Sequence, residues 1–192
     1  MNERDRDFAA LALRTAIGPM LVLHGHNKVF GSGGLTGTTG WFESLGLRPA
    51  AVHARMAAAT EMGAGTLITL GAANPLPTAA VVGLMATAAA TDHRGKGFFV
   101  FKGGWEYTAV VALAATALAG LGNGRWSADR LLGRKERSGA LMAVGAVALG
   151  LAGAGALLAS SYRPSKDEPA EDRPSKDEVD ADTAEAADAA PA

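Results

Sequence analysis

The sequence predicts an all-α integral membrane protein: a four-helix transmembrane bundle, a fifth transmembrane helix and a disordered acidic tail. Two observations lead to this fold class. Apolar runs rich in Ala, Gly, Val and Leu recur between residues 8 and 160, and each approaches the roughly 20 apolar residues that a helix needs to cross a bilayer. The last run contains no charged residue, so it lacks the polar stripe that a soluble helix turns toward water.

Five segments are expected to be helical, with Gly, Pro or charged clusters between them. The first is retained rather than cleaved, because mixed charges precede it and Arg14 interrupts it, unlike the apolar stretch of a signal peptide. The second is the weakest by hydropathy, since it carries His53, Arg55 and Glu61. The five segments are residues 8–29, 50–73, 75–92, 104–121 and 139–160.

The Gly-rich segment at residues 31–40, followed by Trp41 and Phe42, is expected to be a flexible interfacial loop with an aromatic anchor. A nucleotide-binding loop is excluded for two reasons. Thr36 stands where a dinucleotide motif needs its third glycine, and no Gly-Lys-Ser/Thr sequence is present for a phosphate-binding loop.

The net charge differs between the body of the chain and its C-terminal tail. Before Tyr162 there are fourteen Lys and Arg against nine Asp and Glu, and from there on four against ten. The tail lacks apolar periodicity and repeats Arg-Pro-Ser-Lys-Asp-Glu, so we expect it to be disordered. The expected domains are a four-helix membrane domain at 1–132, a basic linker and additional transmembrane helix at 133–161, and the tail at 162–192.

The chain has no cysteine. Thiolate metal sites, iron–sulfur clusters, c-type haem attachment and a cysteine nucleophile are therefore excluded. No metal site is expected from histidine either, because His24 and His26 are two residues apart and point to nearly opposite sides of a helix. A haem held between His24 and His93 stays possible by composition, but no spacing requires it.

Charged groups within a bilayer are costly and so mark candidate functional residues. At about 1.5 Å rise per residue, Arg14 and Glu61 are expected at the same depth in neighbouring helices. We predict that they form a buried ion pair, the loss of which costs about 3–5 kcal/mol. Such a pair is either structural or part of a proton or quinone site.

A second cluster is predicted at the membrane face opposite the N-terminus: His24, Lys28, His93, Glu106 and Tyr107. A carboxylate, histidines and a phenol beside the aromatic loop at residues 94–102 could bind a quinone headgroup or relay protons. The alternative is that these are ordinary interfacial side chains at helix ends.

The orientation of the protein in the membrane is predicted from the number of Lys and Arg in its short loops. These residues are slightly more numerous around residues 4–6 and 125–137 than in the loops of the opposite side. We therefore expect a multi-pass protein of the plasma membrane with a cytoplasmic N-terminus and an external tail.

Several short motifs in order along the chain resemble the DoxX family of small bacterial membrane proteins. The likeness covers residues 8–132, and Asn123 stands where the family often has proline. It implies a four-helix membrane bundle and a link to quinone-dependent sulfur oxidation or to thiol and oxidative-stress systems. The matching residues are Arg14, Gly18, His24-Gly25, Lys28, Trp41 to Gly46, Glu61, Gly63, Gly65, Gly71, His93 to Phe99, Glu106-Tyr107, Gly122 to Ser127 and Asp129-Arg130.

The expected function is therefore an accessory or quinone-interacting subunit of a membrane redox system, not catalytic on its own. Its expected partners are the lipid bilayer, an oxidoreductase and a second copy of the chain, with a quinone as the one cofactor suggested and no nucleic acid. Two other functions remain open: a small-solute transporter that uses the buried charges, and a scaffold whose acidic tail recruits a basic partner.

Overall fold

The computed structural model describes residues 2–164 and residue 179. The described residues are helical and contain no β-sheet, which confirms the predicted all-α class for this part of the chain. The elements are α1 (Glu3–Phe30), α2 (Gly34–Ser44), α3 (Ala50–Leu70), α4 (Leu76–Thr91), the 3₁₀ turn η1 (Val100–Lys102), α5 (Glu106–Leu121), α6 (Ala128–Leu131) and α7 (Ala140–Ser161).

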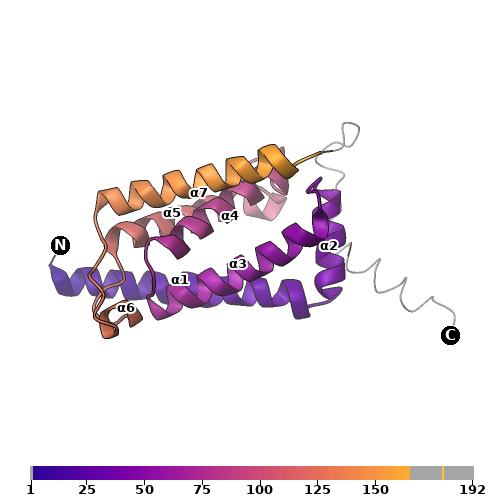
Figure 1. Cartoon of the computed structure of the whole chain (residues 1–192). Coiled ribbons are helices and arrows are strands. Elements are labelled where there is room, and N and C mark those ends of the chain that lie inside the picture. Colours follow the sequence, from indigo (N-terminus) through magenta and orange to yellow (C-terminus); the bar gives the residue numbers. More distant parts are fainter. Residues whose placement is uncertain (1, 165–178, 180–192) are drawn as a thin grey trace.

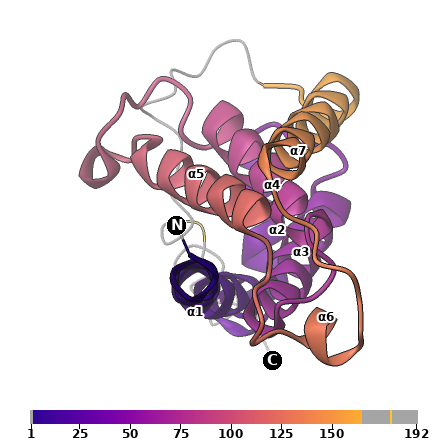
Figure 2. The same cartoon turned by 90° about the vertical axis from the view of Figure 1, so that its left-hand side faces the viewer.

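The five long helices run side by side along one axis, with α2 lying across one end and α6 at the other (Figure 1). α1 packs mainly on α3, and α4 packs on both α5 and α7. The end view in Figure 2 places α1 and α7 at opposite edges of this bundle. The five predicted helices are thus present, and their ends agree with the expected segments to within a few residues.

Two pairs of glycines let helix backbones approach closely. A Cβ added to Gly18 of α1 would lie 2.8 Å from the Gly65 carbonyl oxygen of α3. In the same way, a Cβ added to Gly83 of α4 would lie 2.9 Å from the Gly150 carbonyl oxygen of α7. Small residues at such crossings are typical of helix packing in membranes. These glycine contacts hold α1 against α3 and α4 against α7, and a space remains between the two helix pairs.

The prediction of a flexible loop at residues 31–40 is wrong, because most of this segment belongs to α2. Its glycines lower the intrinsic helix propensity, but tertiary contacts compensate. The Thr38 hydroxyl donates to the Lys28 carbonyl oxygen over 2.8 Å at the end of α1. Phe42 is buried against Leu47 and Ala54. α2 therefore closes one end of the bundle as an ordered helix.

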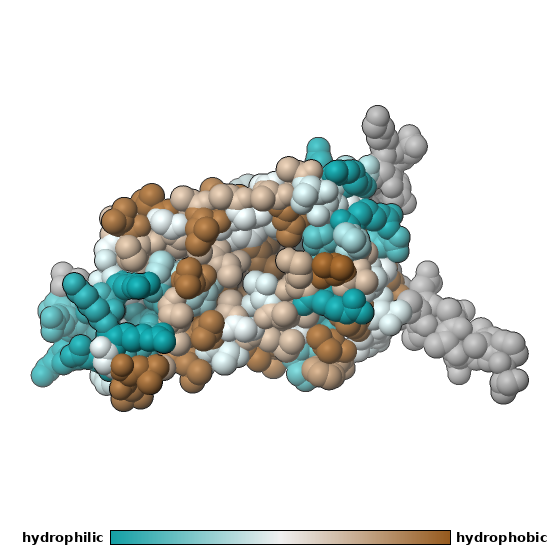
Figure 3. All heavy atoms as spheres, in the orientation of Figure 1, coloured by the Kyte–Doolittle hydropathy of each residue, from teal (hydrophilic) through white to brown (hydrophobic). Residues whose placement is uncertain are grey.

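Surface chemistry fits a bundle in a bilayer. α1 and α7 are each long and apolar enough to cross a membrane, while α4 and α5 are apolar but have 16 residues each. α3 has 21 residues but carries the ionisable side chains that weakened it by hydropathy. On the face drawn in Figure 3, hydrophilic residues gather at the two ends and hydrophobic residues cover the middle.

The chain leaves α7 beside the turn between α2 and α3. The Arg48 backbone amide donates to the Ser161 carbonyl oxygen over 2.8 Å, and the Arg163 amide donates to the Gly46 carbonyl oxygen over 2.7 Å. Leu47 and Tyr162 form an isolated β-bridge between these two bonds. The expected disorder of the tail concerns residues 165–178 and 180–192, which lie outside the described residues.

Candidate functional site

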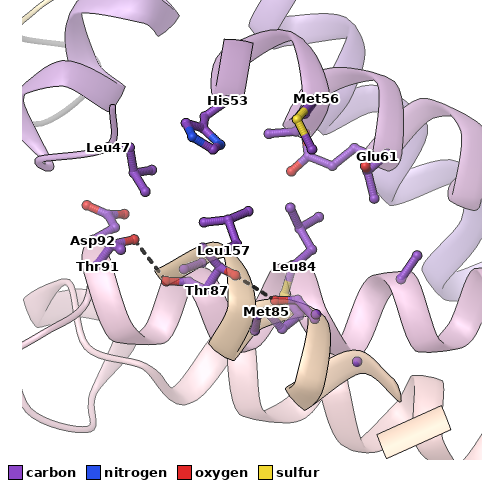
Figure 4. Close-up of a pocket in the computed structure, with 18 of the residues that line it drawn as sticks. Leu47, His53, Met56, Glu61, Leu84, Met85, Thr87, Thr91, Asp92 and Leu157 are labelled. Carbon is purple, nitrogen blue, oxygen red and sulfur yellow. Dashed lines mark hydrogen bonds between the residues drawn. The ribbon is translucent and has the colours of Figure 1, made fainter. Parts of the chain in front are cut away.

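A cavity of about 450 Å³ lies between α2, α3, α4 and α7. This volume is within the range of small-molecule sites, roughly 300–1,000 Å³. Apolar side chains form most of its wall, and a small number of polar residues of α1, α2, α3 and α4 also line it. Figure 4 shows His53 and Glu61 of α3 and Thr87 of α4 among them. The polar groups are Lys28, Trp41, His53, Thr60, Glu61, Thr87, Thr91 and Asp92.

Lys28 and Glu61 form a buried ion pair in the wall of the cavity. The Lys28 ammonium lies 2.9 Å from Oε1 and 2.8 Å from Oε2 of Glu61. The two side chains are only 12% and 7% exposed. Lys28 also lies 5.9 Å from the ring centroid of Trp41, a distance at which a cation is attracted to an aromatic face. The pair places both signs of charge at the cavity without leaving either uncompensated.

The predicted Arg14–Glu61 pair is wrong. The Arg14 guanidinium donates instead to four backbone carbonyl oxygens, of Ile68, Thr69, Asn123 and Trp126, over 2.7–3.0 Å. These carbonyls belong to the C-terminal end of α3 and to the loop between α5 and α6. Arg14 therefore joins a helix end, where a cation is favoured, to a connecting loop.

The depth estimate failed because it counted the depth of Arg14 from His24 and not from the end of the helix. α1 continues to Phe30, and α2 follows before the chain turns back. Gly25 lies against Ala58 and Met62 of α3, so Glu61 lies near the level of Gly25. That is about 16 Å along the helix axis from Arg14, at about 1.5 Å per residue.

Three buried polar atoms of cavity-lining residues have no hydrogen-bond partner among the described residues: Nδ1 of His53, Nε1 of Trp41 and Oε2 of Glu61, of which the last is in ion-pair contact with Lys28. His53 is 8% exposed, and its Nε2 lies 3.3 Å from the Arg48 carbonyl oxygen. A carbonyl can only accept, so Nε2 carries a proton, and in the neutral imidazole Nδ1 is then an acceptor. The indole Nε1–H is a donor. One acceptor and one donor without a partner thus belong to side chains that line the same cavity.

Asp92 and two threonines complete the polar part of the wall at the C-terminal end of α4. Thr87 donates to the Gly83 carbonyl oxygen and Thr91 to that of Thr87, each over 2.9 Å. Their hydroxyl oxygens keep acceptor capacity because each proton is used within the helix. Asp92 lies 3.5 Å from the Lys96 ammonium.

The structure brings the predicted five-residue cluster together only in part. Lys28 lines the cavity with Glu61. His24 and Tyr107 contact each other, with 3.5 Å between Nε2 and the phenol oxygen. His93 and Glu106 hold the intervening loop instead. Nδ1 of His93 lies 2.6 Å from the Gly103 carbonyl oxygen, and Glu106 accepts from the Val100 amide over 3.0 Å.

The sequence prediction missed His53 and Trp41 as members of the site. A signal for His53 was present: His53, Thr60 and Glu61 are spaced by seven and eight residues and so share one face of a helix with Met56. No comparable signal existed for Trp41, because its position depends on α2. Among residues 2–164 and 179, no three His, Asp or Glu side chains converge as a metal site.

Comparison with known proteins agrees with the resemblance noted from the sequence. Residues 9–94 match the DoxX family, which confirms that resemblance over this part of the expected span. The match includes α1, α2, α3 and α4 and therefore most of the cavity wall. α5 and α7 lie outside it. No curated protein and no solved structure matches the chain.

Proposed function

We propose, from the DoxX family domain at residues 9–94 and the apolar helices of this membrane protein, that the chain binds a quinone in the cavity between α3, α4 and α7. In this role it is an accessory subunit of a membrane redox system. The observation that carries the proposal is the presence of two buried atoms without a polar contact, His53 Nδ1 and Trp41 Nε1, in side chains of a largely apolar wall.

The polar groups suit both oxidation states of such a ligand. A quinone carbonyl oxygen can only accept a hydrogen bond, and the Trp41 indole and the Lys28 ammonium are donors. A quinol hydroxyl can also donate, and His53 Nδ1 is an acceptor. Glu61 holds the Lys28 ammonium in the cavity wall. Buried polar groups left without partners are costly, so a ligand that satisfies them gains affinity.

Fluorescence tests the proposal, because quinones quench nearby tryptophans. The chain has three tryptophans, and Trp41 is the one in the cavity wall. The variant Trp105→Phe/Trp126→Phe keeps Trp41 alone, in mild detergent or proteoliposomes. Titration with a quinone should quench it saturably. His53→Leu should weaken that binding about tenfold, the value of one net hydrogen bond.

Two controls make the result specific. His26→Leu removes an exposed imidazole that stacks on Phe30 and does not line the cavity, so it should leave the titration unchanged. A variant that keeps only Trp126 should show no saturable quenching. Non-saturable quenching of Trp41, or equal effects of the two histidine changes, would refute the proposal. Solute flux abolished by Glu61→Gln would then favour the transporter function.

A further inference from the structure

The two ends of the cavity differ in polarity, and the Lys28–Glu61 pair lies between them, with Glu61 about 12 Å from His53 along α3. Thr91 and Asp92 lie at the C-terminal end of α4, beside His53 (Figure 4). Leu76 lines the cavity from the first residue of the same helix. At about 1.5 Å per residue, Leu76 and Thr91 are about 22 Å apart along α4. The cavity is therefore elongated along the helices, and a ligand with a polar head and an apolar tail matches it.

The wall of the cavity is open toward the outer surface between α3 and α7. Met56 of α3, Leu76 of α4 and Leu149 of α7 line the cavity, yet they are 51%, 59% and 56% exposed. α3 and α7 each pack on α4, but the two helices do not pack closely on each other. Figure 3 shows the recess between α7 above and α3 below, within the hydrophobic middle of this face.

α7 contributes two glycines, Gly150 and Gly153, to the cavity wall. Gly150 is buried against α4, and a Cβ there would lie 2.6 Å from the Ala79 carbonyl oxygen. Gly153 also lines the cavity, but a Cβ added to it would meet no atom within 4 Å. The side of α7 that faces the cavity is thus left open at Gly153, beside the apolar side chains of Leu149 and Leu157.

From these observations, and resting on the proposed function, we infer that the gap between α3 and α7 is a lateral portal. It admits the quinone from the bilayer and holds the first part of its long apolar side chain against Leu149, Gly153 and Leu157. The headgroup lies at the polar end, near His53 and Trp41. α7, which lies outside the matched family domain, then determines which side chains are accepted.

Gly153→Phe tests this inference, because a Cβ added there meets no atom within 4 Å. The matched control is Gly155→Phe, since Gly155 is equally unobstructed but does not line the cavity. Each variant is titrated with two probes through Trp41 fluorescence: a quinone with a long isoprenoid chain and the same ring without the chain. Gly153→Phe should weaken the long-chain quinone about tenfold, because contact with roughly two methylene groups is lost.

The outcomes separate the inference from the proposal on which it rests. Support requires that Gly153→Phe weakens only the long-chain probe and that Gly155→Phe affects neither. If both probes bind the parent protein but Gly153→Phe leaves the long-chain affinity unchanged, or weakens both probes equally, the portal is refuted and quinone binding stands. If neither probe binds the parent protein, the proposed function itself fails.

Discussion

Replacement of Arg14 by methionine tests the role assigned to this buried cation. In the described part of the chain, the carbonyl oxygens of Thr69, Asn123 and Trp126 have Arg14 as their hydrogen-bond donor and no other. The fourth carbonyl, of Ile68, also accepts from the Gly71 amide over 3.0 Å and so keeps a partner. Arg14→Met therefore leaves three carbonyls unpaired.

The expected loss of stability follows from this count. An unsatisfied buried carbonyl costs about 1–3 kcal/mol, and the lower value applies here because two of the three bonds are partly exposed. The total is about 3 kcal/mol. For a chain of this size each kcal/mol lowers Tm by about 2–4 °C, so Arg14→Met should lower Tm by about 6–12 °C. Thermal unfolding of the purified protein in detergent, followed by tryptophan fluorescence, measures this.

Two further variants serve as a charge-conserving comparison and as a control. Arg14→Lys keeps the charge, but an ammonium lacks the planar fork that reaches several carbonyls, so its Tm should fall between those of the parent and Arg14→Met. Arg55→Met removes an exposed arginine of α3 and should leave Tm nearly unchanged. The reasoning is refuted if Arg14→Met unfolds at the parental temperature, or if Arg55→Met has the same effect.

Two more predictions concern contacts between helices of the bundle. Lys28→Met leaves the Glu61 carboxylate buried without its partner and should cost about 3–5 kcal/mol, whereas Lys28→Met/Glu61→Leu should recover most of that stability; unfolding titrations of the single and double variants compare them. Gly150→Leu should detach α7 from α4, because its Cβ would lie 2.6 Å from a carbonyl oxygen of α4, while Gly145→Leu, with no atom within 4 Å of its Cβ, should be tolerated. Protease sensitivity of the α6–α7 connection distinguishes the two glycine variants.

The long helices could be predicted from the sequence because each depends on local composition. An uninterrupted apolar run such as residues 140–161 indicates a helix without knowledge of its neighbours. α2 could not be predicted in this way, because three of its eleven residues are glycine and its stability comes from contacts such as that of Phe42 with α3. Tertiary packing overrides local propensity here.

The partners of the charged residues were predicted less well, for a geometric reason. Depth along a helix can be counted only from a known level, and counting from His24 rather than from Phe30, the end of α1, shifts the estimate by about 9 Å. Glu61 lies nearer to the end of α1 than that estimate placed it, and it pairs with Lys28 rather than Arg14. His93 and Glu106 were grouped by their positions at helix ends, yet both bond to the backbone of the loop between them. Loop conformation decides such contacts.

The chain after α7 is attached by backbone hydrogen bonds to a turn that forms part of the cavity wall. Backbone bonds join Ser161 and Arg163 to the turn that carries Leu47, and Leu47 lines the cavity. A protein or tag fused after residue 164 is therefore attached next to this turn. One fused at the N-terminus is attached at the far end of the bundle (Figure 1).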